Sequence, residues 1–121
     1  MNTTDLQGAA QALVAQGKGI LAADESTPTI TKRFKSIDLL STEENRRAYR
    51  EMLFTAPQLG DFISGVILFD ETIRQEAADG TPFPEVLGRQ GVIAGIKVDK
   101  GAKALAGFPG EKVTEGLDGL R

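Results

Sequence analysis

The chain alternates between amphipathic stretches and short runs of apolar residues. Apolar positions at helical spacing predict a helix over residues 4–17. A capping box from Ser41 to Glu44 is expected to open a longer helix that ends near Pro57. Shorter helices are predicted over residues 28–36 and 84–89.

Three apolar runs between these helices are predicted to be strands, over residues 19–24, 63–69 and 92–98. The second run reads ISGVILF and is almost continuously apolar, which is typical of a strand covered on both faces. Strands that alternate with helices indicate right-handed crossovers and a parallel sheet. The pattern therefore predicts an α/β fold.

Length and charge narrow the class of protein. A chain of 121 residues suits one domain, and a formal net charge of −3 gives no overall basic field for nucleic acid. No apolar run is long enough to span a bilayer, and the N-terminus MNTTDLQGAA lacks the pattern of a secretory signal. We therefore expect a cytoplasmic protein that binds neither nucleic acid nor membranes.

The chain contains no cysteine and no histidine. Thiol catalysis and cysteine-ligated metals are excluded for these residues, and the commonest zinc ligand and general base are missing. We expect no metal and no cofactor here. Acid–base chemistry in this segment must use Asp, Glu, Lys or Tyr.

Asp24 and Lys97 are the first candidate pair. Asp24 closes the first predicted strand, and Lys97 shares one face of the third strand with Gly95 and Asp99. A lysine that points inward from a buried strand needs a partner, and the ends of parallel strands meet at one rim. We expect Asp24 and Lys97 to meet there, either as a functional site or as a purely structural ion pair.

A second cluster lies at the start of the helix that follows the first strand. Hydroxyls and backbone N–H groups at a helix N-terminus, with two cations nearby, suit a phosphate. An N-cap with an exposed basic face is the alternative. The residues are Ser26, Thr29, Lys32 and Arg33.

Two further groups of charged residues receive structural interpretations. Asp70 and Glu71 follow the second strand and are expected to cap a helix or to lie exposed at the rim. Arg46, Arg47 and Arg50 are expected to form an exposed surface paired with glutamates of their own helix.

Three parallel strands cannot close a barrel, because a (β/α)₈ barrel needs eight strands and about 250 residues. A Gly-rich stretch follows the third strand, and another helix is expected to begin near Arg121. The chain is then either a small open sheet or the first part of something larger, and its unfinished end favours the second.

Six motifs in order and register give a resemblance over nearly the whole chain from about Leu6. They are GILAADEST, STEENRR, ISGVILFDETI, GTPFPEVL, GIKVDKG and GLDGL. Together they resemble the class I (Schiff-base) fructose-bisphosphate aldolases. The resemblance implies the N-terminal part, about three βα modules, of a (β/α)₈ TIM barrel with parallel strands. Residues 1–121 would form part of a single domain, with an N-terminal helical segment in 1–18 and the first three βα modules in 19–121.

The resemblance also implies an activity. The family cleaves fructose 1,6-bisphosphate reversibly to dihydroxyacetone phosphate and glyceraldehyde 3-phosphate, in glycolysis and gluconeogenesis, without a metal. Its members commonly form homotetramers. The lysine that forms the Schiff base and the glutamates that handle protons lie on later strands, outside this chain. The isolated 121-residue chain is therefore expected to be an inactive part of a lyase.

The resemblance assigns roles residue by residue. Asp24 would act near the C4 hydroxyl of the substrate during carbon–carbon cleavage, and Lys97 would line the site beside it. The residues expected to contact the substrate or its phosphate are Ser26, Thr29, Lys32, Arg33 and Arg46. Thr29 stands where the family has a serine, and Pro28 where some members have glycine.

Two other readings remain open at this point. The chain could be a non-catalytic module that binds a phosphate or associates with a full-length aldolase through its open strand edges. It could also be an unrelated small α/β protein in which Lys97 and Asp24 form only a structural pair.

Overall fold

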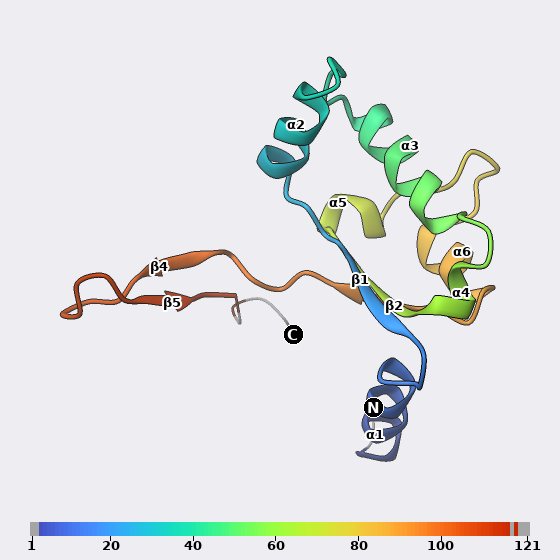
Figure 1. The fold of residues 1–121 in the computed structure, drawn as a ribbon, viewed down its shortest axis with the longest axis horizontal. Coiled ribbons are helices and arrows are strands. Elements are labelled where there is room, and N and C mark those ends of the chain that lie inside the picture. Colours follow the sequence, from blue (N-terminus) through green and yellow to red (C-terminus); the bar gives the residue numbers. More distant parts are fainter. Residues whose placement is uncertain (1–2, 117, 119–121) are drawn as a thin grey trace.

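The computed structural model describes residues 3–116 and residue 118 and contains a small parallel sheet with helices (Figure 1). The elements, in chain order, are α1 (Thr3–Leu13), β1 (Gly19–Ala23), α2 (Thr27–Lys35), α3 (Glu43–Phe54), α4 (Leu59–Phe62), β2 (Ile63–Leu68), α5 (Asp70–Ile73), α6 (Phe83–Gly88), β3 (Ile93–Ile96), β4 (Ala102–Ala104) and β5 (Lys112–Thr114).

The main sheet has the order β1-β2-β3, and both pairings are parallel. Ala23 lies opposite Leu68, and Leu68 lies opposite Ile96, so the three strands end together at one rim. The predicted strand order and direction are confirmed. The strands are one to three residues shorter than predicted, and the third is shortened at both of its ends.

The core lies between the sheet and the helices α3 and α6, which cover the same side of it (Figure 1). Phe54 of α3 and Phe83 of α6 meet edge to face, with ring centroids 5.1 Å apart. Such aromatic pairs contribute about 1 kcal/mol beyond the area they bury. The fully buried residues of this cluster are Ala23, Phe54, Val66, Leu68, Phe83, Leu87 and Val92.

Helix α1 lies at the end of the sheet opposite α2 and α5 (Figure 1). The buried hydroxyl of Ser64 shares its proton between the carbonyl oxygens of Leu13, at 2.6 Å, and Gly19, at 3.2 Å. Gly65 leaves room for α1, since a Cβ there would stand 2.5 Å from the Leu13 Cδ2 atom. These contacts fix the segment after α1 to the beginning of the sheet.

Helix α3 differs from the prediction at both ends. Its N-cap is Thr42, not Ser41, because the Thr42 Oγ1 atom accepts a hydrogen bond of 3.1 Å from the Asn45 backbone N–H. It ends at Phe54, and Gln58 follows with a left-handed backbone. The apolar side chain of Met52 is 61% exposed, and the buried residues of the helix are Arg50 and Phe54.

The segment after β3 forms an antiparallel hairpin that the sequence pattern did not predict. β4 pairs with β5, with Lys103 opposite Val113, and the hairpin extends away from the helices (Figure 1). The Lys100 N–H donates to the Glu115 carbonyl oxygen at 2.8 Å, which joins the base of the hairpin to the rim. The helix expected near Arg121 lies outside the described residues.

Candidate active site at the rim of the sheet

Asp24 and Lys97 meet at the carboxyl ends of β1 and β3, as predicted. The Lys97 ammonium donates to the Asp24 Oδ2 atom at 3.3 Å and to the Asp99 Oδ2 atom at 2.5 Å. The side chains of Lys97 and Asp24 are 24% and 23% exposed, so each keeps contact with solvent. The Lys97 backbone N–H also donates to the Leu68 carbonyl oxygen at 2.8 Å, which fixes the lysine beside β2.

The two carboxylates keep Lys97 charged. The hydrogen bond that Lys97 donates to Asp99 is the largest effect and raises the pKa of Lys97 above its ordinary value. Burial opposes it, and the hydrogen bond that Lys97 donates to Asp24 raises the pKa further. The same ammonium lowers the pKa of Asp99. Lys97 is therefore a cationic hydrogen-bond donor at neutral pH, and it is not available as a free amine nucleophile.

A cavity of about 370 Å³ opens beside Lys97. It is lined by Ser26, Phe69, Asp70, Lys97, Asp99, Lys100 and Gly101. Its lining combines two ammonium groups with two carboxylates and a hydroxyl, and it is contributed by the segments that follow β1, β2 and β3. A pocket of this size with both signs of charge can hold a small polar molecule.

The predicted phosphate cluster is only partly brought to this cavity. The hydroxyls of Ser26 and Thr29 lie 3.1 Å apart at the start of α2, and Ser26 also lines the cavity. Thr29, Lys32 and Arg33 are not among the residues that line it. Lys32 is exposed on α2.

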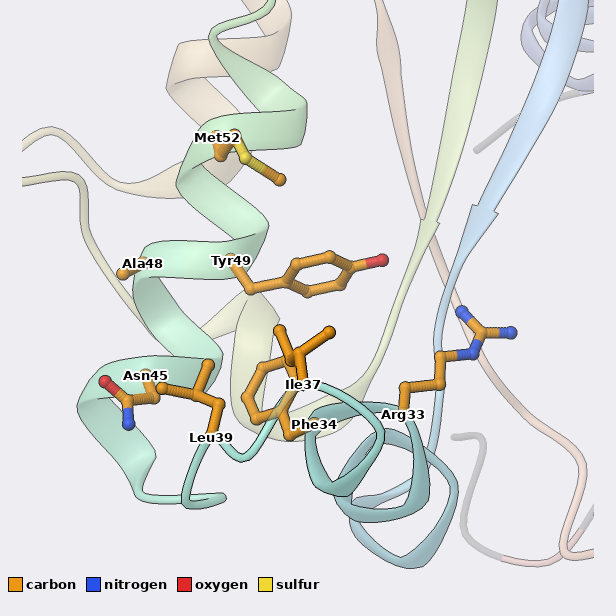
Figure 2. A pocket seen from close by; sticks show the side chains of 8 residues that line it. All are labelled: Arg33, Phe34, Ile37, Leu39, Asn45, Ala48, Tyr49 and Met52. Carbon is orange, nitrogen blue, oxygen red and sulfur yellow. The ribbon is translucent and has the colours of Figure 1, made fainter.

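Arg33 is exposed, as the alternative of an exposed basic face expects, and it has an acidic partner that was not predicted from the sequence. Its guanidinium forms an ion pair of 2.5 Å with the Glu25 carboxylate. It also borders an apolar groove of about 400 Å³ between α2 and α3, where Phe34 and Tyr49 meet edge to face (Figure 2). In Figure 2 the Arg33 guanidinium points away from the aromatic rings, toward β1.

The three α3 arginines were expected to be exposed and paired on their own helix, and the pairing is confirmed for Arg47, whose side chain is 20% exposed. Arg47 pairs with Glu44 at 2.7 Å and Glu51 at 2.5 Å on its own helix. Arg46 and Arg50 instead cross to the rim of the sheet, so for them the prediction was wrong.

Arg46 forms a two-pronged ion pair with Glu71, at the carboxyl end of β2. Its Nε and Nη2 atoms donate to the two Glu71 carboxylate oxygens, each at 2.8 Å, and its Nη1 atom donates to the Ser41 carbonyl oxygen. This hydrogen bonding raises the pKa of Arg46 and lowers that of Glu71. Glu71 is therefore a partner of α3 and not an exposed rim residue, whereas Asp70 is exposed and pairs with Arg74.

Arg50 is fully buried behind the end of β1. Its Nη2 atom donates to the Glu25 carbonyl oxygen at 2.8 Å and to the Glu25 carboxylate at 3.1 Å. Burial lowers its pKa, and the charge of Glu25 opposes that effect. The sequence contained a signal for this burial, since Arg46, Arg50 and Phe54 recur every four residues and share one face of α3.

None of the helices in the described part of the chain has the length and apolar character that a transmembrane span requires.

Comparison with known proteins gives the family. Residues 5–121 match the family model described as fructose-bisphosphate aldolase class-I. A protein of Xanthomonas campestris pv. campestris, named "Probable fructose-bisphosphate aldolase class 1", is 64% identical over 121 residues, which are 100% of this chain and 36% of that protein. Fructose-bisphosphate aldolase of Drosophila melanogaster is 58% identical over 117 residues, which are 96% of this chain and 32% of that protein.

The fold comparison agrees with the sequence comparison. A Plasmodium falciparum fructose-bisphosphate aldolase, solved in a ternary complex with TRAP and a small molecule inhibitor, matches with a TM-score of 0.91 and 53% identity. The match covers 97% of this chain and 34% of that one, so this chain spans about a third of the length of its relatives. On this evidence the chain belongs to the class I fructose-bisphosphate aldolase family and corresponds to the N-terminal part of its members.

Proposed function

We propose that these residues form one wall of the active site of an aldolase that cleaves fructose 1,6-bisphosphate reversibly to dihydroxyacetone phosphate and glyceraldehyde 3-phosphate. The observation that carries the proposal is the Asp24–Lys97 pair, 3.3 Å apart beside an open cavity at the rim of the sheet, in a chain of this family. Residues 1–121 then belong to a single (β/α)₈ domain, with the N-terminal helical segment in 1–18 and the first three βα modules in 19–121.

Asp24 and Lys97 have different roles in carbon–carbon cleavage: Asp24 accepts a proton, and Lys97 holds a substrate oxygen. The C4 hydroxyl of the sugar must lose its proton as the bond to C3 breaks, and a carboxylate at a solvent-accessible rim can accept it. Lys97 stays charged between Asp24 and Asp99, so it can hold a substrate oxygen by a charge-assisted hydrogen bond. The lysine that forms the Schiff base with the keto group is supplied by a later strand.

The phosphate and sugar contacts come from the start of α2 and from α3. The adjacent hydroxyls of Ser26 and Thr29, with Lys32 one turn further along, suit a phosphate oxygen at a helix N-terminus. Arg33 and Arg46 reach the substrate only by sharing the carboxylates of Glu25 and Glu71 that now hold them. The complete protein acts in glycolysis as a cytoplasmic homotetramer on a sugar phosphate.

The test uses a complete enzyme. In the Xanthomonas relative, the matching 121-residue segment is replaced by this chain, and the parent protein is assayed alongside it. The chimera should cleave fructose 1,6-bisphosphate at a rate close to that of the parent. The isolated 121-residue chain should show no cleavage.

Two variants of the chimera then examine the pair. Asp24→Asn and Lys97→Met should each lower kcat by at least about 100-fold, the effect of losing a positioned acid, base or charged donor. Asp61→Asn and Lys103→Met make the same chemical changes at exposed positions and should retain full activity. Turnover of Asp24→Asn equal to that of Asp61→Asn would show that this carboxylate has no part in the reaction.

A further inference from the structure

We propose that Arg50 is a positioning residue for Asp24: it holds the backbone on both sides of Asp24 and so directs the Asp24 carboxylate toward Lys97. The inference rests on the proposed function, because it assigns Arg50 a role in the same site. The hydrogen bonds of Arg50 go to Ala23 and Glu25, which do not line the cavity, so we assign Arg50 an effect that acts through Asp24.

The geometry places one guanidinium across the end of β1. The Arg50 Nη2 atom donates to the Glu25 carbonyl oxygen at 2.8 Å, and the Nε atom approaches the Ala23 carbonyl oxygen at 3.4 Å. Ala23 and Glu25 are the two neighbours of Asp24 in the chain. A rigid planar fork that spans both carbonyls restricts rotation of the peptide groups between them, and these groups determine where the Asp24 side chain points.

Glu25 is removed from the site by the same contacts. Its carboxylate accepts from Arg50 at 3.1 Å and from Arg33 at 2.5 Å, and its side chain is 9% exposed. Two adjacent acids are thereby sorted to different cations: Glu25 to the arginines of α2 and α3, and Asp24 to Lys97. Without Arg50, the two carboxylates could compete for the single ammonium of Lys97.

The choice of residue type points the same way. Arg50 is fully buried, and burying a guanidinium is unfavourable compared with an apolar side chain of similar volume. A methionine or leucine could fill this space beside Phe54 and improve the core. Only a group with several fixed donors can hold two carbonyl oxygens and a carboxylate together, and this requirement explains an arginine here.

The test compares Arg50→Lys and Arg50→Met in the chimera with Arg47→Met. Arg47 is the matched control, because it lies on the same helix and forms two ion pairs but no contact with the end of β1. Arg50→Lys keeps the charge and most of the volume, so it remains folded if the methionine variant does not. Circular dichroism establishes folding for each variant.

Loss of positioning should appear in kcat. Arg50→Lys and Arg50→Met should lower kcat about tenfold or more with KM changed less than about twofold, because a small displacement of a reacting group slows the chemical step. Arg47→Met should leave both parameters unchanged. A folded Arg50 variant with the kcat of Arg47→Met would overturn the proposal.

A double variant separates positioning from a general loss of structure. If Arg50 acts through Asp24, then Asp24→Asn with Arg50→Lys should be no slower than Asp24→Asn alone. Losses that multiply in the double variant would overturn the proposal, because they would show an effect independent of Asp24.

A crystal structure of the Arg50→Lys chimera supplies a readout that needs no activity. The Lys97 Nζ to Asp24 Oδ2 distance should increase beyond about 4 Å, the limit for an ion pair. An unchanged distance would overturn the inference even if the chimera were active. An inactive parent chimera would instead count against the proposed function and leave this structural measurement decisive for Arg50.

Discussion

The ion pairs at the rim of the sheet and those on the outer helical surface have different constructions. At the rim, the partners are far apart in sequence: 73 residues separate Lys97 from Asp24, and 25 separate Arg50 from Glu25. On the surface, Arg74 with Asp70 and Arg89 with Glu85 are four residues apart on one helical stretch. The Arg50 side chain is 0% exposed, whereas that of Arg89 is 62% exposed.

This contrast shows which charges shape the molecule. A surface pair joins residues that the helix already holds together, and water and salt screen it. A rim pair joins the end of one strand to another element, in a less hydrated place where an unpaired charge is costly. The rim pairs therefore determine how the ends of β1, β2 and β3 are arranged around the cavity.

The largest expected effect is at Glu25. Glu25→Ala leaves the buried guanidinium of Arg50 without its carboxylate, and we expect the free energy of unfolding of the chimera to fall by about 3 kcal/mol. Urea-induced unfolding measures the change. Adding Arg50→Met in the same chain removes the unpaired charge and should restore part of the loss. If Glu25→Ala alone were as stable as the unsubstituted chimera, the ion pairs at the rim would contribute no more to stability than those on the surface.

An intermediate effect is expected at Glu71, whose pKa is lowered chiefly by hydrogen bonding from Arg46. A carboxylate with a lowered pKa in the folded state stabilises the fold above its unfolded pKa, and this contribution is lost as the pH falls through the folded value. Glu71→Gln should therefore cost about 1–2 kcal/mol at neutral pH. Thermal unfolding of the chimera and of its Glu71→Gln variant, measured between pH 7 and about pH 3, should show that their difference in stability disappears in acid. A difference that stays constant over this range would mean that the charge of Glu71 contributes nothing.

The smallest effect is expected at Arg89. Arg89→Met breaks an exposed pair with Glu85, and the free energy of unfolding should change by less than about 0.5 kcal/mol. Urea-induced unfolding measures this change, and in added salt the difference in free energy of unfolding between Arg89→Met and the unsubstituted chimera should stay near zero. A loss comparable to that of Glu25→Ala would place this surface pair in the same class as the rim.

The sequence predicted the structure correctly where a periodic pattern of residues could be combined with a general rule of sheet topology. Alternation along the third strand placed Lys97 on one face, parallel pairing brought strand ends to one rim, and together these predicted the Asp24–Lys97 contact. The order of strands and the direction of the sheet followed from the same reasoning.

The arginines of α3 show why the rest was missed. Pairing rules within a helix find partners three and four residues away, so they correctly predicted that Arg47 pairs with glutamates of its own helix, which are Glu44 and Glu51. They cannot find Glu25 for Arg50, because that contact depends on which face of α3 packs against β1. The hairpin was missed for another reason: each of its strands has three residues, which is too short for a period to be recognised.

Ser64 holds the end of the sheet that lies opposite the rim. Its hydroxyl donates to two carbonyl oxygens, those of Leu13 and Gly19, so the chain is fastened where β1 begins. The Lys18 ammonium adds a hydrogen bond of 2.6 Å to the Gly60 carbonyl oxygen. The strands are thus anchored near their first residues by contacts to main-chain carbonyls, whereas the ion pairs of the rim lie where the strands end. Substitutions that adapt the cavity to a different molecule can accumulate in the segments after the strands, while the anchored end continues to hold the sheet in register.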